Sequence, residues 1–301
     1  MGIDIHGLNF LRHAKNIKLL GDTVTIGRQG LRVTESMAKE LVGTAPSYII
    51  QPYCEELLTD YFGATKVDSI DNSDYEKATH IHNMNEALPN NLCGMYDSII
   101  DFGCLEHIYN VPQALKNCSL LCKPGGQIIH LLPANNFCGH GFWQFSPELF
   151  FSLYSKTNGY SKTEVFVADL SNNKKWYQVK QPNNGKRVNV TSSTGLYVLV
   201  RTVLKRSNFS HSLVQQSDYV YEWGKTAATD LKTLEEPTGL KHGFKKILKK
   251  IPFVCRVLLP VNNLYLRSKL ETGLNDKNPG LTAIEIESFV KLNKINRSSH
   301  L

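Results

Sequence analysis

Residues 96–160 decide the fold class, and they read YDSIIDFGCLEHIYNVPQALKNCSLLCKPGGQIIHLLPANNFCGHGFWQFSPELFFSLYSKTNGY. An apolar run at Ser98–Ile100 ends in a turn at Gly103, and a segment with helical spacing follows. The sequence KPGG at residues 123–126 closes that segment, and a second apolar run, Gln127–Leu132, comes next. Strand, loop, helix, glycine stop and strand in this order are typical of a βαβ unit in a parallel sheet.

Outward from this stretch, further short runs rich in apolar or β-branched residues predict the rest of one sheet. The seven expected strands are Asp22–Ile26, Lys66–Ile70, Thr79–His82, Ser98–Asp101, Gln127–Leu132, Thr163–Ala168 and Leu196–Leu204. Helical spacing in residues 47–62, ended by Gly63, and an N-cap at Ser146 before Pro147 predict helices between strands. The polar segment 172–193 is interpreted as a β-hairpin insertion. The sequence therefore predicts a doubly wound α/β fold.

Length and composition suit one α/β domain with an appendage. The chain has 301 residues, of which 42% are hydrophobic and 20% charged, as in proteins that form a core. The pattern changes beyond Arg206, so we expect a domain at 1–206 and a polar, basic helical extension at 207–301. The net charge of +7 is modest, and no basic groove interleaved with aromatic residues appears, which argues against nucleic acid as a partner.

A basic amphipathic helix is expected in the extension. Its apolar residues, Phe244, Ile247, Leu248 and Ile251, lie on one helical face. Five lysines between Lys241 and Lys250 flank that face. Such a helix either packs its apolar stripe on the domain, with the lysines in solvent, or lies on an anionic membrane surface. The second alternative would make the protein membrane-peripheral.

Seven cysteines stand without any C-x-x-C pair. Cys118 and Cys122 are four residues apart, but no further ligands at zinc-site spacing accompany them, so no metal site is expected. All seven are interpreted as small buried apolar residues. The N-terminal residues lack the apolar core of a signal peptide, and no apolar run is long enough to span a membrane. These features favour a reducing, cytoplasmic location.

The quoted stretch resembles the second half of a class I S-adenosylmethionine (SAM) dependent methyltransferase domain, of the type 11 kind. In that family a fourth strand ends near a Leu-Glu-His triplet, here Leu105-Glu106-His107, and a Lys-Pro-Gly-Gly turn leads into the fifth. Loop 135–144 also resembles a subgroup found with polysaccharide biosynthesis genes. The resemblance implies a Rossmann-like, mostly parallel sheet of seven strands, the last of them usually antiparallel.

The resemblance places SAM at the carboxyl ends of the strands. Asp71 stands where the family keeps an acidic residue that binds the ribose hydroxyls, although a surface aspartate in a turn is the alternative. Asn83 and Met84 hold the place of the adenine contact, or simply end a strand. Gly103 follows the fourth strand and is assigned to the cofactor as well.

The turn after the first strand departs from the family's Gly-x-Gly loop. It reads Gly27-Arg28-Gln29-Gly30, which is a degenerate form of that motif. Either Gly27, Arg28 and Gln29 hold the cofactor, with a side chain gripping its carboxylate, or this is an ordinary turn in a fold that has lost SAM binding.

The acceptor side is expected at two loops. Glu106 and His107 follow the fourth strand, and His107 is a candidate general base, with a structural role as the alternative. The loop after the fifth strand offers Asn135, Asn136, His140 and Trp143. Amides bind hydroxyls and aromatic faces stack on sugar rings, so these residues suit a small or glycan acceptor. His140 is the first choice as base, and the alternative is a histidine buried beneath Trp143.

Together these features predict a SAM-dependent methyltransferase acting on an oxygen or nitrogen of a small-molecule or glycan acceptor. The alternative is a non-catalytic binding module with the methyltransferase fold. The degenerate glycine motif is the feature that keeps this alternative open.

Overall fold

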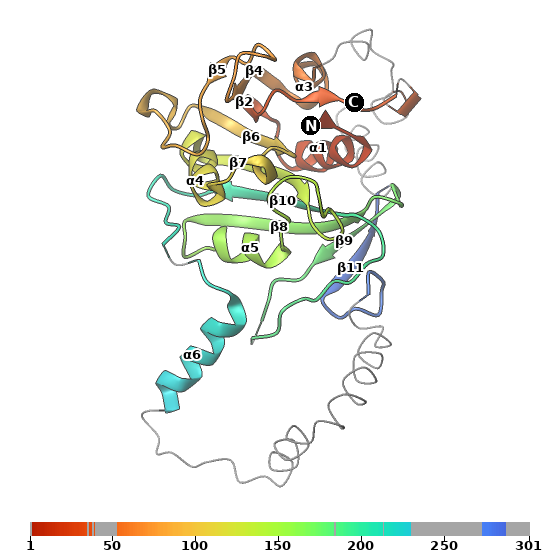
Figure 1. Ribbon diagram of the computed structural model, residues 1–301, viewed down its shortest axis with the longest axis vertical. Coiled ribbons are helices and arrows are strands. Elements are labelled where there is room, and N and C mark those ends of the chain that lie inside the picture. Colours follow the sequence, from red (N-terminus) through yellow and green to blue (C-terminus); the bar gives the residue numbers. More distant parts are fainter. Residues whose placement is uncertain are drawn as a thin grey trace, which may run out of the picture.

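The computed structural model describes residues 2–34, 36–37, 39, 53–183, 185–212, 214–229 and 273–286. Its centre is a nine-stranded sheet in the order β11-β9-β8-β10-β7-β6-β2-β4-β5 (Figure 1). The strands are β2 (Gly21–Ile26), β4 (Ala64–Asp71), β5 (His80–Ile81), β6 (Tyr96–Phe102), β7 (Cys122–Pro133), β8 (Tyr160–Asp169), β9 (Lys175–Val179), β10 (Leu196–Leu204) and β11 (Leu281–Glu285).

All seven predicted strands are present, but the prediction of a seven-stranded, mostly parallel sheet is wrong. The four pairs among β5, β4, β2, β6 and β7 are parallel, and the four pairs from β7 outward to β11 are antiparallel. β10 is antiparallel between β7 and β8, as the resemblance implied for the last strand. The segment read as a hairpin insertion instead adds β9 to the main sheet, and β11 pairs with β9 from far along the chain.

Helices cover both faces of the sheet, and each face has its own apolar core. One core packs α1 (Ile5–Ile17) and α3 (Glu55–Phe62) against inward residues such as Ile100 and Leu199. The other packs α4 (Val111–Leu121) and α5 (Pro147–Leu153) against the opposite side chains of the same strands, such as Ile99. Neighbouring residues of a strand point to opposite faces, so the buried runs of β6 and β7 serve both cores.

The predicted helix starts and stops are partly confirmed. Ser146 caps α5 by accepting a hydrogen bond from the Glu148 amide at 3.3 Å. Gly63 ends α3 in a left-handed conformation with φ of 70°. The predicted helix at 47–62 is shorter than expected, however, because Tyr53 forms a β-bridge with Gly30 and α3 begins only at Glu55. Residues 47–52 lie outside the described residues.

The N-terminal segment has structure that the sequence analysis missed. Asp4 caps α1 through a 2.9 Å hydrogen bond from the Gly7 amide. The two residues before it form β1 (Gly2–Ile3), which pairs in parallel with β3 (Gly30–Leu31) as a separate two-stranded sheet. This pairing holds the N-terminus beside the turn that follows β2.

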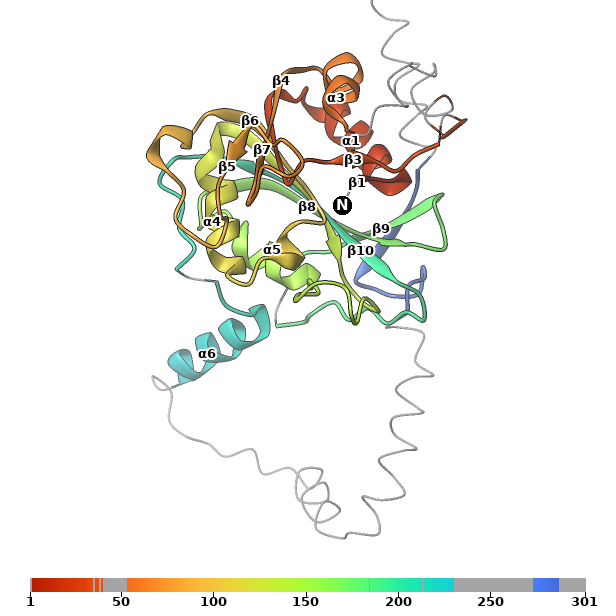
Figure 2. The same cartoon turned by 45° about the horizontal axis from the view of Figure 1, so that its top comes forward.

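Two elements of the described structure lie in the predicted C-terminal extension, 207–301. A helix that was not expected, α6 (Ser217–Thr229), follows Arg206, and β11 returns to complete the main sheet (Figures 1 and 2). The predicted basic helix at Lys241–Lys250 lies outside the described residues. Within the part of the chain that is described, no helix is long and apolar enough to cross a membrane.

The cysteines only partly follow the prediction that all are buried. Cys54, Cys118 and Cys122 are buried, and burial raises the pKa of each thiol. Cys93 and Cys138 are exposed, so the prediction is wrong for these two. Cys255 lies outside the described residues.

Candidate active site at the carboxyl ends of the parallel strands

Two cavities open where the parallel strands end. The β4 cavity, about 330 Å³, is lined by Asp71, Asn83 and Met84 among others. The β7 cavity, about 160 Å³, is lined by Gly103, Glu106 and His140 among others. His107 lines both, so the two cavities are neighbours. The strand order turns back on itself around β2 and β6, which is the position where open α/β sheets bind ligands.

The β4 cavity brings together the residues predicted to hold the nucleoside. Asp71 ends β4, and its carboxylate has one long contact, a 3.4 Å hydrogen bond from the Ser73 amide. Met84 is buried and forms a wall of the cavity. His82, which the sequence analysis did not single out, also lines the cavity, and its Nε2 is buried with no hydrogen-bond partner among the described residues.

Asn83 lines the same cavity but uses its side chain within its own turn. Its Oδ1 accepts hydrogen bonds from the amide and Nδ2 of Asn85, at 3.0 and 2.9 Å. Its Nδ2 donates to Glu86 at 3.3 Å. The predicted adenine contact through the side-chain oxygen of Asn83 therefore competes with the hydrogen bonds that shape the turn.

The side chains of the turn after β2 contact other described residues and line neither the β4 nor the β7 cavity. The Gly27 amide donates to the Ile70 carbonyl at 2.7 Å, which places this turn beside the end of β4. Arg28 pairs with Glu55 at 2.6 Å and stacks 3.9 Å above the ring of Tyr53. Gln29 is fully buried and donates to the Ile26 carbonyl at 2.8 Å. Neither Arg28 nor Gln29 lines the β4 or β7 cavity.

A buried network of hydrogen-bonded side chains fixes the backbone of the turn after β6. Asp101 Oδ1 accepts hydrogen bonds from the amides of Cys104 and Leu105, at 3.0 and 3.3 Å. Asp101 Oδ2 lies 2.8 Å from His130 Nδ1, and His130 Nε2 lies 2.7 Å from the Tyr154 hydroxyl. This network fixes the backbone of the turn, so its own side chains at positions 106 and 107 are available to the cavities.

The loop after β7 docks on that turn through its backbone. The amides of Phe142 and Trp143 donate to the Glu106 carbonyl, at 2.7 and 3.2 Å, and Trp143 Nε1 donates to the Ile108 carbonyl at 3.0 Å. Gly141 has φ of 71°, and a Cβ there would meet the Glu106 carbonyl oxygen at 2.7 Å. Only glycine allows this approach, and the approach brings His140 to the cavity.

As a result, the three residues predicted to be catalytic lie together. Glu106 Oε1 is 3.6 Å from His140 Nε2 and 3.8 Å from His107 Nε2. The centroids of the two imidazole rings are 5.2 Å apart. Glu106 is 2% exposed, and burial together with Asp101 raises its pKa to about 8. Burial and the neighbouring His140 lower the pKa of His107. The His140 side chain is 54% exposed, which contradicts the alternative of a histidine buried beneath Trp143.

The two asparagines predicted to bind the acceptor are used to anchor the loop. Asn135 Nδ2 donates to the Val190 carbonyl at 2.9 Å. Asn136 Nδ2 donates to the carbonyls of Ser192 and Thr194, at 3.0 and 2.7 Å. Neither residue lines the β4 or β7 cavity, and Trp143, which is 40% exposed, lines neither of them either.

Among the β7 cavity residues that the sequence analysis missed, three have polar side chains. Asp4 and Arg32 enter the cavity through the β1–β3 pairing, and Tyr197 enters it from β10. A carboxylate and a guanidinium in one cavity suit a ligand that carries an amino and a carboxylate group. The acidic N-cap at Asp4 was the available sequence signal for the first of them.

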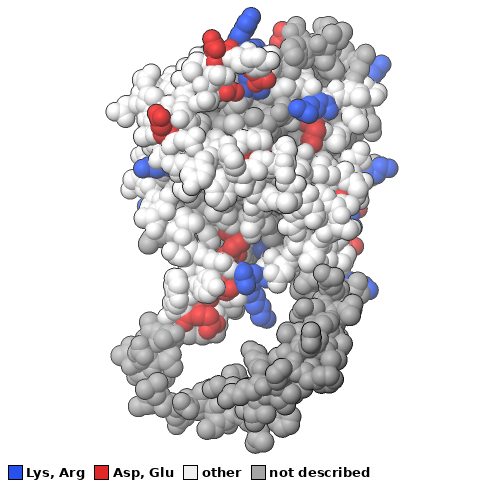
Figure 3. Space-filling view, viewed as in Figure 1, with Lys and Arg blue, Asp and Glu red and all other residues white. Residues whose placement is uncertain are grey.

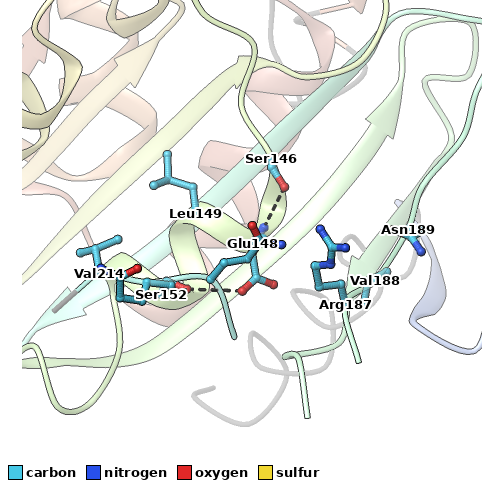
Figure 4. A pocket seen from close by; sticks show the side chains of 10 residues that line it. Ser146, Glu148, Leu149, Ser152, Arg187, Val188, Asn189 and Val214 are labelled. Carbon is cyan, nitrogen blue, oxygen red and sulfur yellow. Dashed lines mark hydrogen bonds between the residues drawn. The ribbon is translucent and has the colours of Figure 1, made fainter. Parts of the chain in front are cut away.

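A third cavity, about 380 Å³, lies apart from this edge and shares no residue with the other two. Figure 4 shows Ser146, Glu148 and Ser152 of the α5 segment facing Arg187 and Val188 from the chain before β10. Glu148 is tied to Ser152 and to the start of α6, at 3.4 and 2.8 Å, so this cavity lies where α5 and α6 meet.

Comparison with known proteins gives a likeness of fold. No family model and no curated protein matches the chain. Among solved structures, the chain is similar to the YcgJ protein of Bacillus subtilis, with 10% identity, a TM-score of 0.39 and coverage of 68% of this chain and 100% of that one. It is similar to the N-methyltransferase NodS of Bradyrhizobium japonicum, with 10% identity, a TM-score of 0.35 and coverage of 67% and 94%.

A third similar structure is an S-adenosylmethionine dependent methyltransferase of Mesorhizobium loti, with 13% identity, a TM-score of 0.29 and coverage of 44% and 54%. NodS has also been solved with S-adenosylhomocysteine. At identities and TM-scores this low, the functional argument rests on the residues of the site itself.

Proposed function

We propose that this chain is a SAM-dependent methyltransferase that modifies an oxygen or nitrogen atom of a small or glycan-type acceptor. The observation that carries the proposal is the pair of adjoining cavities that share His107. One cavity presents an acidic residue at a strand end, and the other presents an acid–base cluster. A group-transfer enzyme has to bring its donor and its acceptor together, and His107 lies where these two cavities adjoin.

The β4 cavity suits the nucleoside of SAM. Its volume, about 330 Å³, lies at the lower end of the range for small-molecule sites. Asp71 would accept hydrogen bonds from the ribose hydroxyls, and Met84 would pack on the adenine ring. The unpartnered Nε2 of His82 offers a hydrogen bond that no described residue takes up. The residues present therefore fit the cofactor.

The methionine end would reach past Gly103 into the β7 cavity. Arg32 would bind its carboxylate and Asp4 its ammonium group, since both line that cavity. These two residues take over the role that the sequence analysis gave to Arg28 and Gln29. SAM supplies an electrophilic methyl group, and the chain has to bring a nucleophile into line with it.

On the acceptor side, the chain supplies alignment, desolvation and a base. Holding acceptor and donor in contact accounts for much of the rate in such displacements. His140, whose side chain is 54% exposed, would take the proton of an acceptor hydroxyl through Nε2, which lies 3.6 Å from Glu106 Oε1. Trp143 offers a face on which a sugar ring can stack.

Isothermal titration of the full chain with SAM and with S-adenosylhomocysteine tests the proposal. We expect both to bind at one site per chain. If neither binds to the folded protein, the proposal fails and the second candidate, a non-catalytic binding module, takes its place. The observation that favours that candidate is the turn after β2, where Arg28 is paired with Glu55 and no open glycine loop is present.

A further inference from the structure

Glu106, His107 and His140 approach one another without bonding one another. Their ligand atoms all lie within 4.8 Å, yet Glu106 Oε1 is 3.6 and 3.8 Å from the two imidazole nitrogens. These separations exceed those of hydrogen bonds between such groups, about 2.7–3.2 Å. Three groups that converge and stop short of contact have the spacing of ligands around a central atom.

Glu106 supplies a second, independent sign of a missing ligand. The residue is 2% exposed, and its Oε2 is buried with no hydrogen-bond partner among the described residues. An unpaired buried carboxylate oxygen is costly, because desolvation is not offset by a bond. A cation bound by this carboxylate would offset part of the cost through its charge, although the oxygen nearest the two imidazoles is Oε1.

We propose that Glu106, His107 and His140 bind a divalent transition-metal ion through one carboxylate oxygen and two Nε2 atoms. Ligand bonds of about 2.0–2.2 Å would require the donor atoms to move closer to one another than the 3.6 and 3.8 Å that separate Glu106 Oε1 from the two imidazole nitrogens here. Two imidazoles and one carboxylate suit Zn²⁺, Fe²⁺, Mn²⁺ or Co²⁺ better than Mg²⁺ or Ca²⁺, which prefer all-oxygen sites.

The backbone that carries the three side chains is held in place by its surroundings. Asp101 holds the turn that carries Glu106 and His107, and the close approach of Gly141 fixes the loop that carries His140. Supporting contacts of this kind orient metal ligands. With only three protein ligands, coordination positions remain open toward the β7 cavity, whose volume of about 160 Å³ admits water or a substrate oxygen.

A metal ion at this cluster would change how the acceptor is activated. This consequence rests on the proposed methyltransferase function. A hydroxyl bound to the ion loses its proton more readily, as metal-bound water does. The two histidines then serve as ligands rather than as bases, and the class of acceptor narrows to one with an oxygen that can coordinate the ion.

Cobalt and zinc titrations of the full chain test the proposal. After treatment with a chelator, Co²⁺ is added and its visible absorption is followed, and Zn²⁺ binding is measured by calorimetry. We expect one ion per chain, with affinity reduced at least about tenfold in His140→Ala and His107→Ala. Both side chains are about half exposed, at 54% and 42%, so these variants should keep the fold.

Two control variants make the outcome specific. His80→Gln removes a histidine outside the cluster, which contacts Tyr96 at 3.0 Å. Cys138→Ser removes the exposed thiol in the same loop. Both should bind the metals as the unmodified chain does. The proposal is overturned if no stoichiometric binding occurs, or if His140→Ala and His107→Ala bind as tightly as the controls.

The same samples separate this proposal from the methyltransferase assignment. SAM binding is titrated with and without Zn²⁺. If SAM binds and no metal does, only the metal site fails. If metal binds at the cluster and SAM does not bind, only the proposed function fails.

Discussion

The turn after β2 and the turn after β6 lie at the same edge of the sheet, and each has a glycine with positive φ, Gly27 at 69° and Gly103 at 85°. They differ in what holds them. The β2 turn is held by its own side chains, since Arg28 pairs with Glu55. The β6 turn is held by Asp101 inside the strand. Because another residue fixes its backbone, the β6 turn can offer its own side chains to a ligand.

The largest effect is expected from replacing His140, which lies beside the side chains of the β6 turn. His140→Ala should slow methyl transfer by about 10²–10⁴-fold, the usual contribution of a positioned acid–base or ligand group. SAM affinity should stay nearly unchanged, because Asp71, Asp4 and Arg32, rather than His140, are proposed to hold the cofactor. The rate of methyl transfer is measured as formation of S-adenosylhomocysteine with a panel of hydroxylated acceptors. The affinity for SAM is measured by calorimetry.

Cys138→Ser is the matched control for His140→Ala, because it changes an exposed residue of the same loop. The control should keep full activity. A His140→Ala protein with a lower melting temperature and no SAM binding would instead assign the histidine a structural role.

The next effect concerns the neighbouring cavity. Asp71→Ala should weaken SAM binding by about 1–3 kcal/mol, the cost of losing hydrogen bonds to a charged group. Asp74→Ala is the control, since Asp74 is exposed in the same segment and does not line the β4 cavity. Calorimetry on both variants gives the comparison. Equal affinities in two folded proteins would show that the ribose is held elsewhere.

Two glycines of the loop after β7 test whether the contact of this loop with the β6 turn positions His140. Gly139 and Gly141 both have positive φ, so alanine at either should cost about 1–2 kcal/mol of unfolding free energy. A Cβ at Gly139 meets nothing within 4 Å, whereas one at Gly141 meets Glu106. Only Gly141→Ala should therefore also displace His140 and reduce activity.

Urea unfolding and activity assays on the two variants test this difference. Equal losses of stability together with equal activities would mean that the contact between Gly141 and Glu106 does not position the loop.

The smallest effect is expected at the β2 turn. Arg28→Met should lower the unfolding free energy by about 1 kcal/mol, through loss of a partly exposed ion pair and a cation–π contact. SAM affinity should change by less than about threefold, since Arg28 lines neither cavity. A tenfold loss of SAM affinity at unchanged stability would show that Arg28 binds the cofactor. The side chains of the β2 turn would then contact a ligand, as those of the β6 turn are proposed to do.

The sequence predicted the parallel core of the sheet because its strands are short apolar runs bounded by strong turn signals. It also placed Asp71 at the end of a strand, and Glu106 in the turn that follows one. It could not show that His107 and His140, weighed as alternative bases, lie in one cluster with Glu106, because that depends on the fit of Gly141 against a backbone carbonyl. Asp4 and Arg32 were missed because a two-residue pairing between distant segments has no periodicity.

Charged side chains of the described residues are not concentrated on the surface that Figure 3 shows. On the face shown in Figure 3, lysine and arginine are scattered among acidic and uncharged residues rather than gathered over one element. The described residues of that face therefore form no single-charge patch that would attract a charged ligand over a long distance.

The pairing of β11 with β9 has a consequence for how the protein is made. Leu281 pairs with Val179, so β9 receives its outer neighbour only after about a hundred further residues have been added to the chain. At about 5–20 residues per second, that interval lasts several seconds on the ribosome. Throughout it, β9 presents an open edge to other nascent chains, and unpaired edges are sites of aggregation. The yield of folded protein therefore depends on how well β9 is shielded before synthesis reaches residue 285.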